Sequence, residues 1–223
     1  MTVSGSRRKA QTRPRARRGD GLRLRDEILE ATERLMLASG DADAVSLRAV
    51  ANAVGVTPPS IYLHFADKVD LIFAVCERNF ARLDEAMQAA AAGASDPVDE
   101  LLRRGRAYVR FGLAHPEQYR ILFMNPPSAS PPRSQDPAVV GGDAFNHLVG
   151  AVRRGGEAGA IRGDPLLASF TVWSAVHGLT SLLIAKPDFP WPPVDEFVEH
   201  VVQAQIAGLA RGDSWAVPAP PGP

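Results

Sequence analysis

The chain has 223 residues, of which 45% are hydrophobic and 22% are charged. This is the composition of a globular protein of one or two domains, and it excludes collagen-like, heptad-repeat and wholly disordered chains. The chain has 25 basic residues (Lys and Arg) and 25 acidic residues (Asp and Glu), so its formal net charge is zero. Residues 1–25, however, contain nine basic residues and one acid. This segment therefore carries a net charge of +8, and the remaining 198 residues carry −8. This asymmetry indicates a basic arm that binds a polyanion, joined to a mildly acidic body.

Cysteine content and the first residues narrow the class further. The single cysteine, Cys76, can form no internal disulfide and cannot build a cysteine-rich zinc site. It lies on the apolar stripe of a predicted helix, which favours a core residue over a redox-active thiol. Residues 1–21 are rich in Arg, Ser, Gly and Pro and contain no apolar run. We therefore expect a flexible basic arm, with no secretory signal peptide and without the apolar face of a transit peptide.

Three helices are predicted at the start of the globular part. Apolar residues recur three and four positions apart over 22–39, which predicts an amphipathic helix. Its apolar face holds Leu24, Ile28, Ala31, Leu35 and Ala38. Ser46 is expected to cap a second helix that ends at Gly55, and Thr57 to cap a short third helix with Pro58 in its first turn. On this third helix the expected inward residues are Ile61 and Phe65, and the expected outward residues are Ser60, Tyr62, Leu63 and His64.

The rest of the chain also predicts helices. Asp67, followed by Asp70 three residues later, is expected to cap a long helix that ends near Gly93. Further helices are predicted at about 97–115, 116–124, 137–158, 165–185 and 194–211. The Pro/Ser-rich segment 126–137 is expected to be a loop, and the tail after Asp213 to be disordered. No segment has the period of two that a strand requires, so the predicted fold class is all-α.

Residues 46–65, SLRAVANAVGVTPPSIYLHF, have the pattern of a helix-turn-helix: two short helices joined by a tight turn that contains glycine. Over residues 22–83 the chain resembles the DNA-binding domain of the tetracycline-repressor (TetR) family of bacterial regulators. The run Tyr-x-His-Phe at 62–65, followed by Lys68 and Leu71, is the most specific part of the match. We therefore divide the chain into a basic arm (1–21), a DNA-binding domain (22–83), a helical ligand-binding and dimerisation domain (84–212) and a tail (213–223).

The resemblance implies roles for individual residues. Ser46 and Thr57 would cap helices whose N-termini meet phosphates, while Ser60 and Leu63 would face the major groove. Tyr62, His64 and Lys68 would contact the DNA backbone. The basic arm and its continuation would add contacts from Arg15, Arg17, Arg18 and Arg23.

One feature departs from the family pattern. Pro58 and Pro59 stand where family members usually place small or polar residues, and prolines offer neither N–H donors nor polar side chains. The third helix then has few groups that can hydrogen-bond to base edges. Our hypothesis is that sequence preference depends on Ser60, on contacts of Leu63 or proline with thymine methyl groups, and on the arm in the minor groove.

The helix at 165–185 has no Asp, Glu, Lys or Arg between Leu166 and Ala185. Its length would allow it to span a membrane, but polar Ser, Thr and His residues interrupt it, and we expect a helix buried on nearly all sides instead. Ser169, Trp173, His177 and Ser181 share one face of it. With the run HPEQYRILF at 115–123, the Trp-His-Gly pattern resembles one TetR subgroup named for those three residues.

Two interpretations of this second region stay open. Trp173 and His177 are either core and interface residues or the wall of an inducer pocket. The residues expected at such a pocket are Tyr108, Phe111, Phe123, Met124, Phe170, Trp173 and His177. No Arg or acid is clearly placed to enter it, so the inducer is expected to be mostly apolar.

The resemblance implies a cytoplasmic, homodimeric transcriptional repressor that binds a palindromic operator and is released by an unidentified small inducer. The dimer would form through helices 165–185 and 194–211. The alternative is a small-molecule-binding helical protein with weak or lost DNA specificity. We expect no enzyme, no cofactor and no metal, because the five histidines have no metal-ligand spacing and the chain contains neither a nucleophile elbow nor a phosphate-binding loop.

Overall fold

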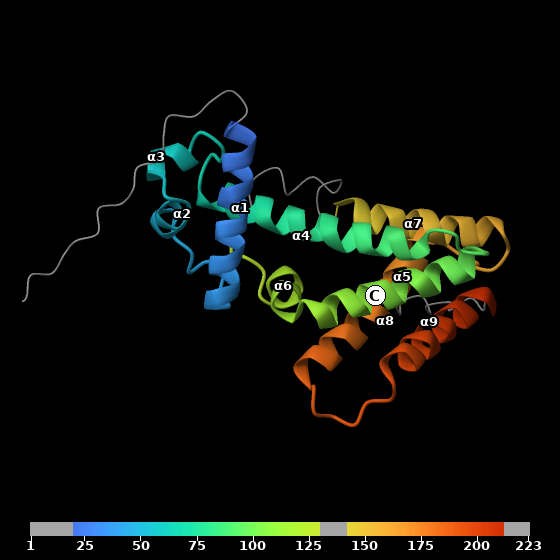
Figure 1. The fold of residues 1–223 in the computed structure, drawn as a ribbon. Helices are drawn as coiled ribbons and strands as arrows, with labels where there is room; N and C mark the ends of the chain where they lie inside the picture. Colours follow the sequence, from blue (N-terminus) through green and yellow to red (C-terminus); the bar gives the residue numbers. More distant parts are fainter. Residues whose placement is uncertain (1–19, 130–141, 212–223) are drawn as a thin grey trace, which may run out of the picture. The chain divides into compact units, whose positions relative to one another are not determined.

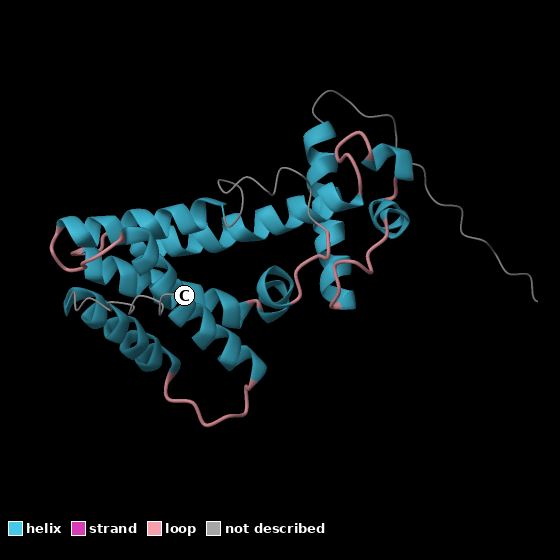
Figure 2. Cartoon of the chain, turned by 180° about the vertical axis from the view of Figure 1, so that it is seen from behind, coloured by secondary structure: helices cyan, strands magenta, loops and turns pink. Residues whose placement is uncertain are grey.

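The computed structural model describes residues 20–129 and 142–211, and within these ranges every regular element is a helix (Figures 1 and 2). The expected basic arm, the later part of the expected loop at 126–137 and the tail lie outside the described residues, apart from the last residues of the arm. The described residues form two compact units. The first comprises residues 20–79 and 117–129, and the second comprises 80–116 and 142–211.

The first unit is built around three helices: α1 (Asp20–Ser39), α2 (Leu47–Val54) and α3 (Pro58–Ile61). α1 packs on α2, and α2 packs on α3. The core side chains are almost fully buried: Ile28, Met36, Val50, Ile61, Phe65 and Leu71. Burial of so many large aliphatic groups, each worth about 1.5–3 kcal/mol, explains how such short helices are held in place.

The buried face of α1 is wider than predicted. Ile28 and Ala31 are buried as expected, whereas Ala38 is exposed. The structure adds Met36 and the polar Thr32, whose hydroxyl donates to the Ile28 carbonyl at 2.7 Å. The sequence pattern missed Thr32 because a hydroxyl that bonds within its own helix can be buried at little cost.

Helix α4 (Lys68–Ala91) begins in the first unit and ends in the second. The predicted cap is confirmed, since Asp67 Oδ1 accepts from the Asp70 N–H at 2.8 Å and Asp70 Oδ2 accepts from the Ala66 N–H at 3.0 Å. Cys76 is buried, as predicted, and burial raises the pKa of its thiol to about 11. The helix predicted at 116–124 is two elements, α6 (Pro116–Tyr119) and a π-helical turn, η1 (Arg120–Met124).

The second unit is a bundle of α5 (Pro97–Ala114), α7 (Gly142–Glu157), α8 (Pro165–Ala185) and α9 (Val194–Arg211), together with the end of α4. α5 packs against all three of the other helices. Gly105 allows this close approach, because a Cβ added there would lie 2.9 Å from a methyl carbon of Val202 and 3.5 Å from one of Val176. Asp96 and Asp164 cap α5 and α8 through their side chains.

The expectation that residues 165–185 are buried on nearly all sides is wrong. α8 is the described helix that is long and apolar enough to cross a membrane by length and composition, but only 44% of its most apolar stretch is buried. One face packs into the bundle through residues such as Val172, Val176 and Leu179. The other face exposes Leu166, Leu167, Phe170 and Leu182. Composition gave no sign of this, because both faces lack charge.

Candidate nucleic-acid interface and ligand groove

The turn between α2 and α3 has the geometry that the sequence predicted. Ser46 Oγ accepts from the Ala49 N–H at 3.2 Å and so caps α2. Gly55 ends α2 in the left-handed region, with φ +75°, and its N–H donates to the Ala51 carbonyl at 2.9 Å. A residue with a Cβ would be strained at that φ, so the glycine fixes the sharp turn that separates the two helices.

The α3 region separates core residues from outward ones, as predicted. Ile61 and Phe65 are 0% and 3% exposed, whereas Tyr62 and Leu63 are 56% and 81% exposed. His64 is half-buried. Pro58 and Pro59 are also exposed, so most of the outward surface formed by α3 and the residues after it is apolar.

The predicted cap at Thr57 is wrong in its chemistry. Thr57 occupies the N-cap position with extended backbone, but its side chain makes no capping hydrogen bond. Its Oγ1 instead lies 3.1 Å from Oγ of Ser60. Pro59 explains part of this difference, because it lacks the N–H at the second helical position from which a capping hydroxyl can accept. The Ser60 N–H, at the third position, donates to the backbone carbonyl of Thr57 at 2.9 Å instead. The expected DNA-facing hydroxyl of Ser60 is therefore engaged with its neighbour.

Two of the basic residues predicted to contact DNA have partners within the protein. Lys68 Nζ donates to the carbonyl of Asp43 and Arg23 pairs with Glu27 at 3.6 Å, both within the first unit. Arg15, Arg17 and Arg18 lie outside the described residues. Arg48, exposed in the first turn of α2, was missed by the sequence analysis, although its place two residues after the Ser46 cap could have indicated it.

Arg25 was also missed as a basic group beside the helix-turn-helix. Its guanidinium carbon lies 5.0 Å above the centre of the Phe65 ring. This cation–π contact joins α1 to the segment after α3. Contacts of this kind contribute about 0.5–1 kcal/mol to stability at exposed sites. Arg25 therefore supports the position of the outward residues and leaves its charge on the surface of the first unit.

In the second unit, two of the residues predicted at a pocket are joined by a hydrogen bond. The hydroxyl of the buried Tyr108 on α5 lies 3.0 Å from Nδ1 of His177 on α8. Burial lowers the pKa of His177, which favours the neutral imidazole. Trp173 lies beside it, with ring centres 5.7 Å apart.

Trp173 and Phe170 also belong to an aromatic cluster that sequence reasoning did not complete. Phe145 on α7 lies 4.9 Å from Phe170 and 5.9 Å from Trp173, measured between ring centres. Phe170 is 44% exposed, so the cluster reaches the surface of the second unit. Phe170 also belongs to the exposed apolar face of α8, together with Leu166, Leu167 and Leu182.

The remaining predicted pocket residues do not join this cluster. Phe123 and Met124 belong to the first unit, where Phe123 packs on Tyr119 with ring centres 4.8 Å apart. Phe111 lies on α5 three residues after Tyr108, and its ring is tilted against that of His115, with ring centres 4.9 Å apart.

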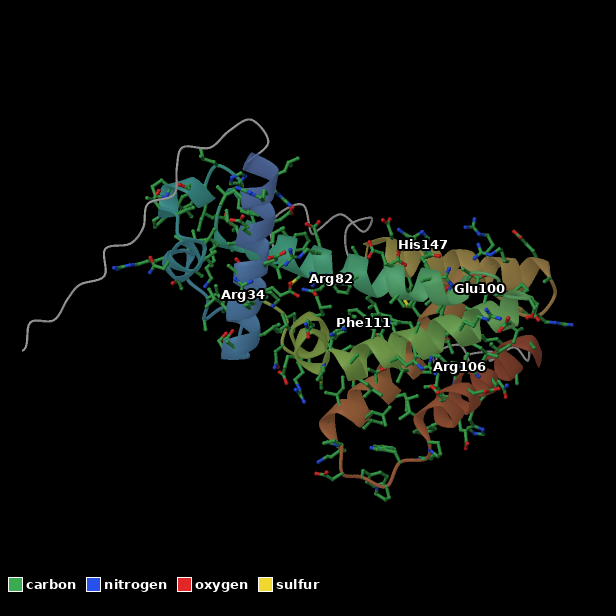
Figure 3. The ribbon with its side chains drawn as sticks, viewed as in Figure 1. Arg34, Arg82, Glu100, Arg106, Phe111 and His147 are labelled. Atoms are coloured by element: carbon green, nitrogen blue, oxygen red, sulfur yellow. The ribbon has the colours of Figure 1, made fainter. Side chains whose placement is uncertain are left out.

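Phe111 instead lines a groove of about 880 Å³ in the second unit. α4 contributes Ala86 and Ala90, α9 contributes Asp195, and α5 contributes most of the wall, including Arg106 and Phe111, which are labelled in Figure 3. Three arginines of α5 line it, so the expectation of a mostly apolar pocket without arginine or acid does not hold for this groove. The described residues contain no group of three or more His, Cys, Asp or Glu that could hold a metal ion.

Two family models match the chain. The model described as "Bacterial regulatory proteins, tetR family" matches residues 28–75, and the one described as "Tetracyclin repressor-like, C-terminal domain" matches residues 101–205. A search of curated proteins found no match. The model names do not test the Trp-His-Gly subgroup, which stays a prediction.

Several solved structures share the fold. A protein of unknown function from Rhodococcus sp. RHA1 is 30% identical with a TM-score of 0.68, covering 84% of this chain and 95% of that one. A TetR family transcription regulator from Marinobacter aquaeolei VT8 is 23% identical with a TM-score of 0.64, covering 85% and 96%. The regulator FadR from Bacillus subtilis, solved in complex with stearoyl-CoA, is 16% identical with a TM-score of 0.67, covering 82% and 98%.

Proposed function

Because this chain belongs to the TetR family of bacterial transcription regulators, we propose that it is a cytoplasmic, homodimeric repressor that a small molecule releases from a palindromic operator. The observation that carries the proposal is the outward surface of the α3 region. Tyr62 and Leu63 are solvent-exposed in a segment whose core residues, Ile61 and Phe65, are fully buried. A segment used only for packing would not need to hold a tyrosine and a leucine in water.

The operator contacts divide into two kinds. Arg23, Arg48 and Lys68 supply positive charge to phosphates, with Tyr62, His64 and the arginines of the arm, Arg15, Arg17 and Arg18. Base reading falls to Leu63, Pro58 and Pro59, whose apolar surface can contact the 5-methyl groups of thymine. Ser60 contributes less than its position suggests, because its hydroxyl is paired with that of Thr57.

Selection from a random-sequence DNA library with the purified protein tests this function. A palindrome should be recovered at physiological salt, as two-fold symmetry of a dimer requires. Replacing each conserved thymine of that palindrome by deoxyuridine removes one methyl group and leaves the hydrogen-bonding edge unchanged. Affinity should fall at thymines beneath α3 and not at those outside it.

A matched variant separates base reading from backbone contact. Leu63→Ala should make the protein indifferent to deoxyuridine while the salt dependence of binding is unchanged. Arg48→Gln should instead reduce the slope of log affinity against log salt by about 0.9 and leave sequence preference intact. Recovery of no palindrome would favour the alternative function, a helical small-molecule binder with lost DNA specificity, which the double proline already suggests.

The dimer is proposed to form through α8 and α9. The outer face of α8 exposes Leu167, Phe170 and Leu182 without any charged residue, and a Cβ built at Gly178 would have nothing within 4 Å. Small residues on the outer face of α9, Ala204, Ala207 and Gly208, are exposed as well. Exposed apolar surface of this kind marks protein interfaces, and small side chains let two helices approach closely.

Sedimentation of a single substitution tests the interface. Leu182→Glu would place a charge within the apolar contact and should convert the dimer to monomer at micromolar concentration. Ala89→Glu, on an exposed position of α4, is the matched control and should remain dimeric. An unchanged dimer in Leu182→Glu would assign the contact to other helices.

The inducer is proposed to bind the second unit and to be mostly apolar. Support comes from the aromatic cluster of Phe145, Phe170 and Trp173 and from the nearby Tyr108–His177 pair. FadR from Bacillus subtilis, with which this chain shares its fold, was solved in complex with stearoyl-CoA. Phe123 and Met124 are proposed to contribute less, because they belong to the first unit.

Release follows from linkage. A ligand that binds better to a conformation in which the recognition helices are misplaced must weaken DNA binding by the same factor by which DNA weakens ligand binding. α4 has residues in both units and is the proposed carrier of the change. A disulfide joining the end of α4 to α5 should leave DNA binding insensitive to ligand, and continued induction in that variant would contradict the proposal.

A further inference from the structure

The groove in the second unit has one wall of an unusual composition. Arg103, Arg106 and Arg110 are spaced three and four residues apart on α5, so they share one face of that helix. The other wall is α4, where Ala86 and Ala90 leave space because their side chains are small. A volume of about 880 Å³ lies within the range of small-molecule sites.

Every carboxylate oxygen of the two acids in the groove is already an acceptor. Asp99 Oδ1 accepts from Arg103 Nε at 2.9 Å, and its Oδ2 accepts from the Ser95 N–H at 2.9 Å. Asp195 accepts from Arg110 Nε at 3.2 Å and from Arg110 Nη2 at 2.7 Å. Each oxygen keeps a second lone pair, but a ligand ammonium group would have to share these carboxylates with the donors that they already bind.

The guanidinium groups are in the opposite situation. Each carries five N–H donors. Besides the bonds to Asp99 and Asp195, Arg103 donates to the Ala92 carbonyl, and Arg106 donates to the carboxylate of Glu199. Among the described residues, these are the hydrogen bonds that the three arginines make. Nε of Arg106 is buried without a hydrogen-bond partner among the described residues. The groove therefore has an excess of donors, which calls for a ligand rich in acceptors.

The ion pairs that line the groove are weak enough to be rearranged. Arg110 and Asp195 have side chains that are 64% and 56% exposed. Exposed pairs of this kind contribute little to stability, because water screens them. A carboxylate or phosphate that takes a share of the Arg110 donors therefore displaces little stability.

We propose that this groove binds an anionic amphiphile, with its carboxylate or phosphate head on the Arg103–Arg106–Arg110 row and its apolar body along Ala86, Ala90 and Phe111. The inference deepens the proposed function, on whose ligand-responsive second unit it rests, by naming the chemical class of the effector. α4 supplies the apolar wall, so the ligand contacts the helix that is the proposed carrier of the change.

Calorimetric titration of the full-length protein, without DNA, tests the site directly. The probe is decanoate below its micelle concentration, and the comparison ligands are decanol and decyltrimethylammonium, which keep the chain and change the head. Decanoate should bind at least ~10-fold more tightly than either, since each charge-assisted hydrogen bond contributes substantially to affinity. Octyl phosphate against octanoate distinguishes a phosphate head from a carboxylate.

Variants of the groove give opposite expected shifts. Arg110→Gln should weaken decanoate binding by ~10-fold, and Ala107→Leu should block the groove. Asp195→Asn removes the carboxylate that competes for Arg110 and should tighten binding, which a purely structural ion pair would not do. Arg153→Gln, on an exposed position of α7, is the matched control and should bind as the parent protein does.

Three results would overturn the inference: equal binding of decanol, tighter binding of decyltrimethylammonium, or decanoate binding that survives both Arg110→Gln and Ala107→Leu. Failure of the proposed function is distinguishable, because it appears in the DNA selection carried out without ligand. A protein that recovers a palindrome and ignores decanoate keeps the function and loses this inference.

Discussion

The outward surface of the α3 region and the groove along α5 are built from opposite materials. The first is a short run of consecutive residues, Pro58 to His64, and is mostly apolar where it meets water. The second is assembled from three helices and is lined by arginines and aspartates. The difference shows that a site made from neighbouring residues can be found in a sequence, whereas a site made from separate helices exists only once those helices pack.

The largest effect is expected at the core beneath α3, where buried and outward residues are close neighbours in the chain. Phe65→Ala should destabilise the first unit by about 3–5 kcal/mol, because a fully buried ring is lost and a cavity remains. Leu63→Ala, two residues away but 81% exposed, should change stability by less than about 0.5 kcal/mol. Urea unfolding, together with amide hydrogen exchange of α2, measures the loss of stability in both variants. Equal destabilisation by the two variants would contradict the division into core and outward residues.

A smaller effect is expected where α5 meets α8 and α9. Gly105→Ala would place a methyl group 2.9 Å from Val202, so we expect a loss of about 1–3 kcal/mol from overpacking, confined to the second unit. Gly178→Ala is the contrasting change. A Cβ there has open space in the monomer, so helix propensity should stabilise the chain by up to about 1 kcal/mol.

The Gly178→Ala variant also tests the proposed dimer interface. If α8 packs against its twin at Gly178, the added methyl group should weaken association even as it stabilises the monomer. Thermal unfolding at low concentration and sedimentation at high concentration separate the two effects. Unchanged association in Gly178→Ala would place Gly178 outside the interface.

The Tyr108–His177 hydrogen bond is expected to contribute modestly. Tyr108→Phe removes the hydroxyl that lies 3.0 Å from His177 Nδ1 and should cost about 1 kcal/mol of stability in the second unit. DNA binding in the absence of ligand should be unchanged, because neither residue belongs to the first unit. An electrophoretic mobility shift with the selected palindrome provides that control.

The smallest expected effect is a pH dependence of the second unit. Burial lowers the pKa of His177 below its ordinary value of 6.5, so the unfolded chain takes up a proton more readily than the folded one. Stability should therefore fall as the pH decreases below about 6.5. His177→Asn should flatten this dependence. Denaturant midpoints from pH 7.5 to 5.5 measure it.

The local elements were predictable because their determinants are neighbours in the chain. Ser46 caps α2, Gly55 ends it, and the Asp67–Asp70 pair starts α4, each through bonds that span a few residues. The exception at Thr57 is also local. Pro59 removed one of the two N–H groups that the cap could have used, and the sequence already contained that information.

The pocket residues were predicted less well. Their composition was correct for a ligand site, but Phe123 and Met124 lie in the first unit, and Phe111 lies apart from the Tyr108–His177 pair. Phe145 and the arginine row were missed because a residue's neighbours across a bundle depend on which helices pack together and at what rotation. The wrong expectation for α8 has the same origin, since both of its faces are uncharged and only packing distinguishes them.

Periodicity, capping residues and turn glycines identified the helical class, the helix-turn-helix and the residues that point outward from it, because each of these signals acts over one or two turns of chain. Tertiary packing alone brings Gly105 close to α8 and α9, leaves one face of α8 exposed, and sets three arginines of α5 opposite two alanines of α4. Those facts depend on contacts between residues far apart in the chain, whose pairing no local pattern specifies.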